Sequence, residues 1–65
     1  RPEDLKIGDY VRVPTGQTGE ICGEWIDPDR TRRLAVRYVD GAIVRREDWF
    51  SPSELDKIRK DARPA

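Results

Sequence analysis

The sequence lacks histidine and methionine, and Cys22 is its only cysteine. One cysteine excludes an internal disulfide and a thiolate metal cluster, and without histidine the commonest metal ligand and proton carrier is missing. No apolar run approaches the roughly 18 residues of a membrane helix, and nothing near the N-terminus resembles a signal peptide. We therefore expect a cytoplasmic protein with no metal, no cofactor and no membrane partner.

The chain also lacks net charge, because 13 basic residues balance 13 acidic ones. The balance is uneven along the chain: residues 1–29 hold three basic and seven acidic side chains, and residues 30–65 hold the rest. Proteins that bind nucleic acid without sequence preference depend on an excess of lysine and arginine. Only a local basic patch would serve that purpose here.

With 65 residues the chain forms one small domain, and such a domain buries only about 60% of the surface of its unfolded chain. We expect residues 1–5 to be a lead-in, residues 6–58 to form the domain, and the polar residues 59–65 to be a flexible tail. The chain starts at Arg1 without an initiator methionine, so we expect it to be a trimmed protein or a piece of a longer one.

Alternating side chains predict short β-strands. In residues 10–13 Val11 and Val13 share one face, and Pro14 with two following glycines ends and reverses this strand. A second strand is predicted over residues 19–26, with Ile21, Gly23 and Trp25 on one face. Gly23 inside that strand indicates a bend or a bulge, which helps a short sheet to curl.

Turn signals place the remaining strands. Asp27-Pro28-Asp29 predicts a solvated turn, followed by a third strand over residues 33–39. Asp40-Gly41 predicts a two-residue type I′ hairpin, and a fourth strand then covers residues 42–46. Ser51, Pro52 and Glu54 predict a single 3-10 turn. We expect a short fifth strand after it, because a four-stranded sheet needs a closing strand to cover its edges.

These features together resemble the SH3-like small barrels over residues 6–58. Residues 8–13 and 18–21 look like the opening of KOW domains, and residues 36–41 and 51–55 look more like Tudor domains. Residues 8–12, 19–23 and 35–36 are more weakly similar to type II plasmid-borne dihydrofolate reductase, without its Val-Gln-Ile-Tyr active-site run. The resemblance implies an all-β fold: a five-stranded barrel with a short 3-10 turn before the last strand.

The resemblance to Tudor domains implies an aromatic cage for a methylated ammonium group, built here from Trp25, Tyr38, Asp40 and Trp49. The alternation of the strands instead favours Trp25 and Tyr38 as core residues, since both are in register with apolar neighbours. Trp49 and Phe50 follow two acidic residues at a junction expected to be irregular, which favours one of them as a surface anchor for a partner.

Five arginines are candidates for a basic face that binds phosphate or carboxylate groups. They are Arg30, Arg32, Arg33, Arg45 and Arg46. The alternative is a solvated face on which nearby carboxylates balance them, namely Asp27, Asp29, Glu47 and Asp48. Cys22 has no histidine to activate it and is interpreted as a small strand residue.

No residue set in the sequence amounts to a catalytic site, so we favour a binding function over an enzymatic one. The leading hypothesis is a non-catalytic SH3-like module that docks a protein partner or its own larger assembly. A nucleic-acid-binding domain of the KOW or Tudor kind, using the five arginines, is the first alternative. The second is an enzyme formed by oligomerisation, as in type II dihydrofolate reductase.

Overall fold

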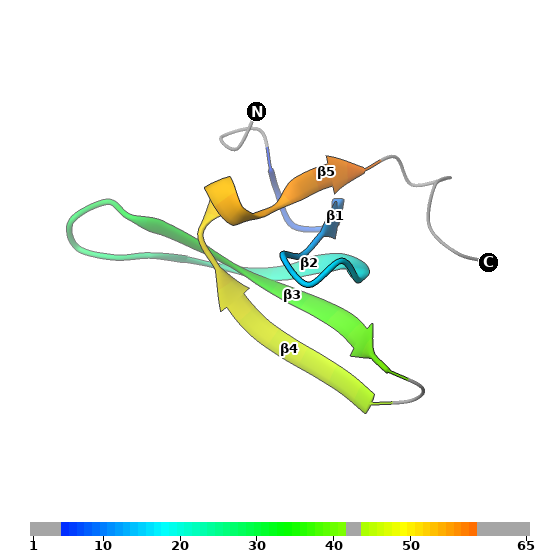
Figure 1. The fold of residues 1–65 in the computed structure, drawn as a ribbon. Coiled ribbons are helices and arrows are strands. Elements are labelled where there is room, and N and C mark those ends of the chain that lie inside the picture. Colours follow the sequence, from blue (N-terminus) through cyan, green and yellow to red (C-terminus); the bar gives the residue numbers. More distant parts are fainter. Residues whose placement is uncertain (1–4, 42–43, 59–65) are drawn as a thin grey trace.

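A computed structural model describes residues 5–41 and 44–58, and these residues form one antiparallel sheet. Its strands lie in the order β4-β3-β2-β1-β5 (Figure 1). The strands are β1 (Tyr10–Arg12), β2 (Thr18–Ile26), β3 (Arg32–Asp40), β4 (Val44–Phe50) and β5 (Asp56–Ile58). A 3-10 turn at Pro52–Glu54 precedes β5. The described residues contain no helix of the length and hydropathy that crossing a membrane requires. The predicted all-β class and five strands are confirmed.

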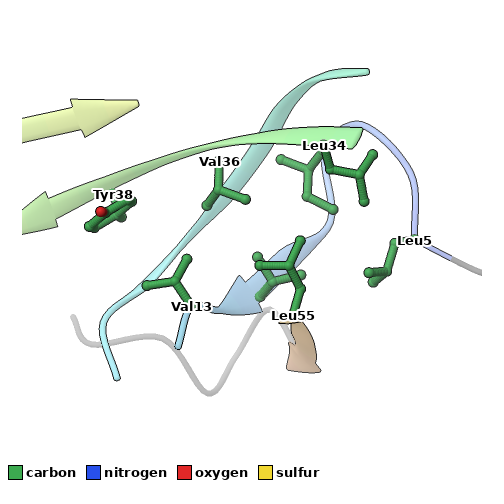
Figure 2. Packing of buried hydrophobic residues seen from close by; sticks show 8 residues of the cluster. Leu5, Val13, Leu34, Val36, Tyr38 and Leu55 are labelled. Atoms are coloured by element: carbon green, nitrogen blue, oxygen red, sulfur yellow. The ribbon is translucent and has the colours of Figure 1, made fainter. Parts of the chain in front are cut away.

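The hydrophobic core lies on one side of β3 and is covered by β1 and the segments next to it. Figure 2 shows Leu5, Val13 and Leu55 facing the core side chains of β3. The buried cluster comprises Leu5, Val11, Val13, Ile21, Leu34, Val36, Tyr38 and Leu55. The face predicted to be shared by Val11 and Val13 and the core position predicted for Tyr38 are therefore confirmed.

Tyr38 is a core residue, with 8% of its surface exposed. Its hydroxyl donates a hydrogen bond to Asp48 Oδ2 at 2.7 Å, which satisfies the polar end of a largely buried side chain. Its ring packs at a tilt against that of Phe50, with 6.4 Å between centroids. Burial of the ring and satisfaction of its hydroxyl together fix β4 against β3.

Gly19 lies where β2 is too close to β3 for a side chain to fit between them. A Cβ atom at this position would overlap the carbonyl oxygen of Arg37 and lie 2.8 Å from Tyr38 Cβ. Backbone atoms cannot move aside as the end of a flexible side chain can. The close pairing of the two strands here depends on the absence of a side chain.

A bulge in β2 changes which side chains face the core. Ile21 pairs with Val36, but Gly23 pairs with Ala35, so Cys22 is an extra residue on β2. After the bulge Trp25 pairs with Arg33, on the side of the sheet opposite the core. The bulge expected near Gly23 is confirmed, whereas the prediction that Ile21, Gly23 and Trp25 share a face is wrong. The extra residue reverses the alternation on which that prediction was based.

The connection between β3 and β4 differs from the predicted two-residue turn. Asp40 pairs with Val44, and Gly41 has a positive φ of +67°. A type I′ turn would also require positive φ at Asp40, which instead continues β3. Of the strand predicted at 42–46, residues 44–46 lie in β4, and residues 42 and 43 lie outside the described residues.

β4 extends to Phe50, so the junction that was expected to be irregular at Trp49 and Phe50 is regular strand. In the extended conformation the two side chains point to opposite sides of the sheet. Phe50 packs against the core, and Trp49 lies on the other side. The 3-10 turn that follows was predicted correctly: Ser51 N donates to Glu54 Oε1 at 2.8 Å, and Glu54 N donates to Ser51 O at 2.9 Å.

The turn between β2 and β3 forms at the predicted Asp-Pro-Asp sequence. Arg30 N donates to Asp27 O, and Asp27 N donates to Thr31 O, both at 2.8 Å. Arg30 takes a left-handed conformation with φ of +71°. Hydrogen bonds from the hydroxyl and amide of Thr31 hold the pKa of Asp29 below its usual value. The carboxylate of Asp29 thus helps to close this turn.

Candidate functional site

The surface of β2, β3 and β4 that faces away from the core carries four of the predicted binding residues: Trp25, Arg33, Arg45 and Trp49. We call this surface the outer face. It consists of Cys22, Gly23, Trp25, Arg33, Ala35, Arg37, Val39, Arg45, Glu47 and Trp49, with Glu20 on the near side of the bulge. Since the core needs none of these side chains, their identity is not dictated by packing inside the sheet.

Two tryptophans dominate one end of the outer face. Trp25 is 58% exposed and Trp49 is 54% exposed, while Ala35 between their strands is only 3% exposed. A Cβ atom on Gly23 would lie 3.9 Å from Cη2 of Trp49, so the indole of Trp49 reaches across β3 to β2. We call Gly23, Trp25, Ala35 and Trp49 the tryptophan patch. The indole of Trp49 extends over the two small residues, and the indole of Trp25 is on the same face of β2 as Gly23.

Asp27 orients one side of the tryptophan patch. Its Oδ1 accepts a hydrogen bond from Trp25 Nε1 at 2.8 Å, and its Oδ2 accepts one from Arg33 Nε at 3.1 Å. An exposed ion pair of this kind adds little stability. It does fix the direction of an otherwise exposed indole, so less rotational freedom remains to be lost when a partner binds.

Cys22, the extra residue of the bulge, lies beside the patch and is partly buried. Its thiol donates a weak hydrogen bond to Ala35 O, with 3.6 Å between sulfur and oxygen. Burial and then the nearby Glu47 carboxylate raise the pKa of this thiol, and Arg37 partly offsets the effect. A thiol with a raised pKa is a poor nucleophile near neutral pH. Cys22 is a small residue within β2, as predicted, and nothing in its surroundings activates the thiol.

The residues predicted for an aromatic cage are not brought together. Tyr38 is in the core and Phe50 packs against it, whereas Trp25 and Trp49 are on the outer face. The side chain of Asp40 lies outside the described part of the structure. Since the sheet separates Tyr38 from the two indoles, these side chains do not enclose a common space.

The five predicted arginines are not gathered into one patch either. The partly buried guanidinium of Arg32 is held by the protein itself: its Nε pairs with Glu24, and its Nη2 donates to the carbonyl oxygen of Leu5. Arg30 and Arg33 are near the β2–β3 turn. Arg45 and Arg46 pair with Val39 and Tyr38, six and five residues further along β3 than Arg33, a separation of roughly 20 Å. Arg46 also approaches Asp48, at 3.7 Å.

The structure adds a groove that the sequence did not indicate, at the end of the outer face distant from the tryptophans. Arg12 of β1, Arg37 of β3 and Arg45 of β4 line it, together with Tyr10 and Val39. The alternation in residues 10–13 places Tyr10 and Arg12 away from the core. Their proximity to Arg37 and Arg45 follows only from the pairing of β1 with β2 and of β2 with β3.

The described residues contain no group of three or more metal-binding side chains. The site therefore consists of surface aromatic and arginine side chains on a rigid sheet, which is an arrangement suited to binding. No protein family model, curated protein or solved structure matches this chain.

Proposed function

We propose that this protein is a non-catalytic interaction module that docks an apolar segment of a protein partner on the tryptophan patch. The observation that carries the proposal is the pair of half-exposed indoles, Trp25 and Trp49, on one face of the sheet, where Trp49 extends over the small residues Ala35 and Gly23. Tryptophan is the residue type most enriched among those that dominate binding energy at protein interfaces. Neither indole is needed to fill the core.

The exposed area is large enough to matter for binding. A tryptophan side chain buries on the order of 200 Å² when fully covered, and about half of each indole is uncovered here. Covering about 100 Å² of apolar surface on each indole contributes about 2.5 kcal/mol per tryptophan before the costs of association. The hydrogen bond from Trp25 to Asp27 reduces those costs, because the ring is already oriented.

The charge around the patch favours an apolar partner over a nucleic acid. Arg33 is the basic residue nearest to Trp25, and Asp27 neutralises it. Binding to a phosphate backbone depends on unneutralised basic side chains. An apolar protein segment bordered by polar groups fits better, with Arg33 and Asp27 in the polar rim.

We place this module among the SH3-like barrels as part of the same proposal. Its support is the strand order, in which β1 lies between β2 and β5, and the 3-10 turn directly before the last strand. Such a relationship concerns the fold alone, and the function rests on the tryptophan patch.

The experiment is selection of peptides from a random twelve-residue phage library on the immobilised protein. We expect enrichment of sequences with aromatic or branched apolar residues. The selected peptides should bind at least about tenfold more weakly to Trp25→Ala and to Trp49→Ala, which loses roughly 1.4 kcal/mol or more. Ile7→Ala is the matched control, because Ile7 is similarly exposed, at 60%, and lies outside the patch.

Equal binding of the selected peptides to the wild type and to both tryptophan variants would refute the proposal, as would the absence of any enrichment from a protein that is monomeric by light scattering. A dimer that Trp49→Ala dissociates would identify the partner segment as a second copy of this chain. Enrichment of acidic peptides that bind independently of both tryptophans would assign docking to another surface.

A further inference from the structure

The groove at the opposite end of the outer face has the charge pattern of a second binding site. One row of side chains crosses four strands there: Arg12 on β1 pairs with Thr18 on β2, and Val39 on β3 pairs with Arg45 on β4. Thr18 lies beside Val39, one position beyond the paired residues Gly19 and Tyr38. All of these residues line the groove. It therefore has an arginine at each end and a mainly apolar floor.

The two arginines stand a predictable distance apart. Neighbouring strands are about 4.8 Å apart, so three strand intervals separate Arg12 from Arg45 by roughly 14 Å. No described carboxylate forms a salt bridge with either arginine. Both guanidinium groups are thus available to an anionic ligand.

The adjoining row of the groove has alternating charge. Tyr10 pairs with Glu20, Glu20 with Arg37, and Arg37 with Glu47. The guanidinium of Arg37 lies 3.4 Å from a carboxylate oxygen of Glu47. Two carboxylates and one guanidinium leave this row with a net charge of −1, while the row that holds Arg12 and Arg45 remains basic.

We propose that this groove binds an extended acidic peptide in which two carboxylate side chains lie about four residues apart. Four residues of extended chain span about 13 Å, close to the separation of Arg12 from Arg45. Each carboxylate accepts a forked pair of hydrogen bonds from one guanidinium. The residue midway between them lies over Thr18 and Val39, whose methyl groups favour an apolar side chain.

The same charges disfavour two other kinds of ligand, a nucleic acid and a methylated ammonium group. A nucleic acid carries a phosphate at every nucleotide, so some phosphates would approach Glu20 and Glu47. A methylated ammonium group would meet Arg12, Arg37 and Arg45. Carboxylates placed only at the two ends avoid both repulsions.

The test measures fluorescence anisotropy of a labelled nine-residue peptide with glutamate at its third and seventh positions, valine at its fifth, and glycine or serine elsewhere. We expect binding in about 50 mM salt that weakens as salt is added. The glutamine analogue of the peptide should bind at least about tenfold more weakly, and Arg12→Gln and Arg45→Gln should each reduce affinity about fivefold. Arg30→Gln carries the same change of charge at the β2–β3 turn, outside both surfaces, and should bind like the wild type.

Three results would overturn the proposal: no binding of the glutamate peptide, equal binding of its glutamine analogue, or an equal loss in Arg30→Gln. Tighter binding of an eight-nucleotide oligothymidine, lost in Arg12→Gln and Arg45→Gln, would make the groove a nucleic-acid site instead. Circular dichroism checks that each variant is folded. Trp49→Ala should leave the affinity for the peptide unchanged, so this result and the result for the tryptophan patch are independent.

Discussion

The two faces of the β2–β3–β4 sheet differ in what constrains them. On the inner face Ile21, Leu34 and Val36 are almost completely buried, and they are the side chains that a small domain needs to exclude water. On the outer face the two largest side chains, Trp25 and Trp49, are more exposed than buried. The inner face explains why the chain folds. The outer face holds the residues that folding does not explain, and these indicate function.

Aromatic residues illustrate the difference most clearly. Tyr38 and Trp49 are on adjacent strands, yet the hydroxyl of Tyr38 is satisfied inside the fold and the indole of Trp49 lies on the surface. Residue type alone would assign both to the core. Their positions relative to the sheet separate a structural role from a binding role.

The strongest test of this comparison is one truncation on each face. Leu34→Ala should lower the free energy of unfolding by about 2–5 kcal/mol, because it leaves a cavity in a fully buried site. Trp25→Ala should lower it by less than about 1 kcal/mol, since more than half of its side chain is already in water. Urea unfolding followed by circular dichroism measures both. A larger loss for Trp25→Ala than for Leu34→Ala would reverse our assignment of the two faces.

A smaller but still large loss of stability is expected at Gly19, where β2 lies close against β3. Gly19→Ala should destabilise the fold by about 1–3 kcal/mol, because the new methyl group overlaps the backbone of β3. Gly16→Ala is the control: Gly16 also lies near the start of β2, and a Cβ atom there meets nothing within 4 Å. Its φ of +101° still imposes strain of about 1 kcal/mol. A midpoint of thermal unfolding no lower for Gly19→Ala than for Gly16→Ala would contradict the close approach of the strands.

The smallest effect concerns the thiol of Cys22. Burial and Glu47 raise its pKa, so Glu47→Gln should increase the rate of alkylation by iodoacetamide near pH 8, by about twofold to fivefold. The folded state holds the thiol proton more tightly than the unfolded state does. The associated stability is present below the unfolded pKa and is lost as pH rises through the folded pKa. Mass spectrometry follows the reaction, and an unchanged or slower rate in the variant would exclude Glu47 as a cause.

Alternation predicts the faces of this sheet wherever pairing is uninterrupted. It placed Val11, Val13 and Tyr38 correctly. It failed for Trp25, because one extra residue in β2 reverses the pattern, and a bulge leaves no strict signature in a single sequence. The C-terminal end of β4 was also mispredicted, because the strand continues through Glu47 and Asp48 to Phe50.

The proposed binding surfaces were harder to predict than the fold. Trp49 was singled out from its unusual position, but it is exposed because alternation along β4 turns its side chain away from the core. Arg12 and Arg45 lie 33 residues apart in the sequence and line one groove only because four strands pair in a given register. Local patterns carry no information about such a distance, so the groove could not be found without the structure.

The bulge at Cys22 has a consequence for how this chain tolerates changes in length. Cys22 is the unpaired residue of the bulge, so the residues before and after it have consecutive partners on β3. Deleting Cys22 would bring Gly23 directly after Ile21, restore strict alternation and leave Trp25 paired with Arg33 on the outer face. A single-codon deletion at this position would thus leave the tryptophan patch in place, as many substitutions there would.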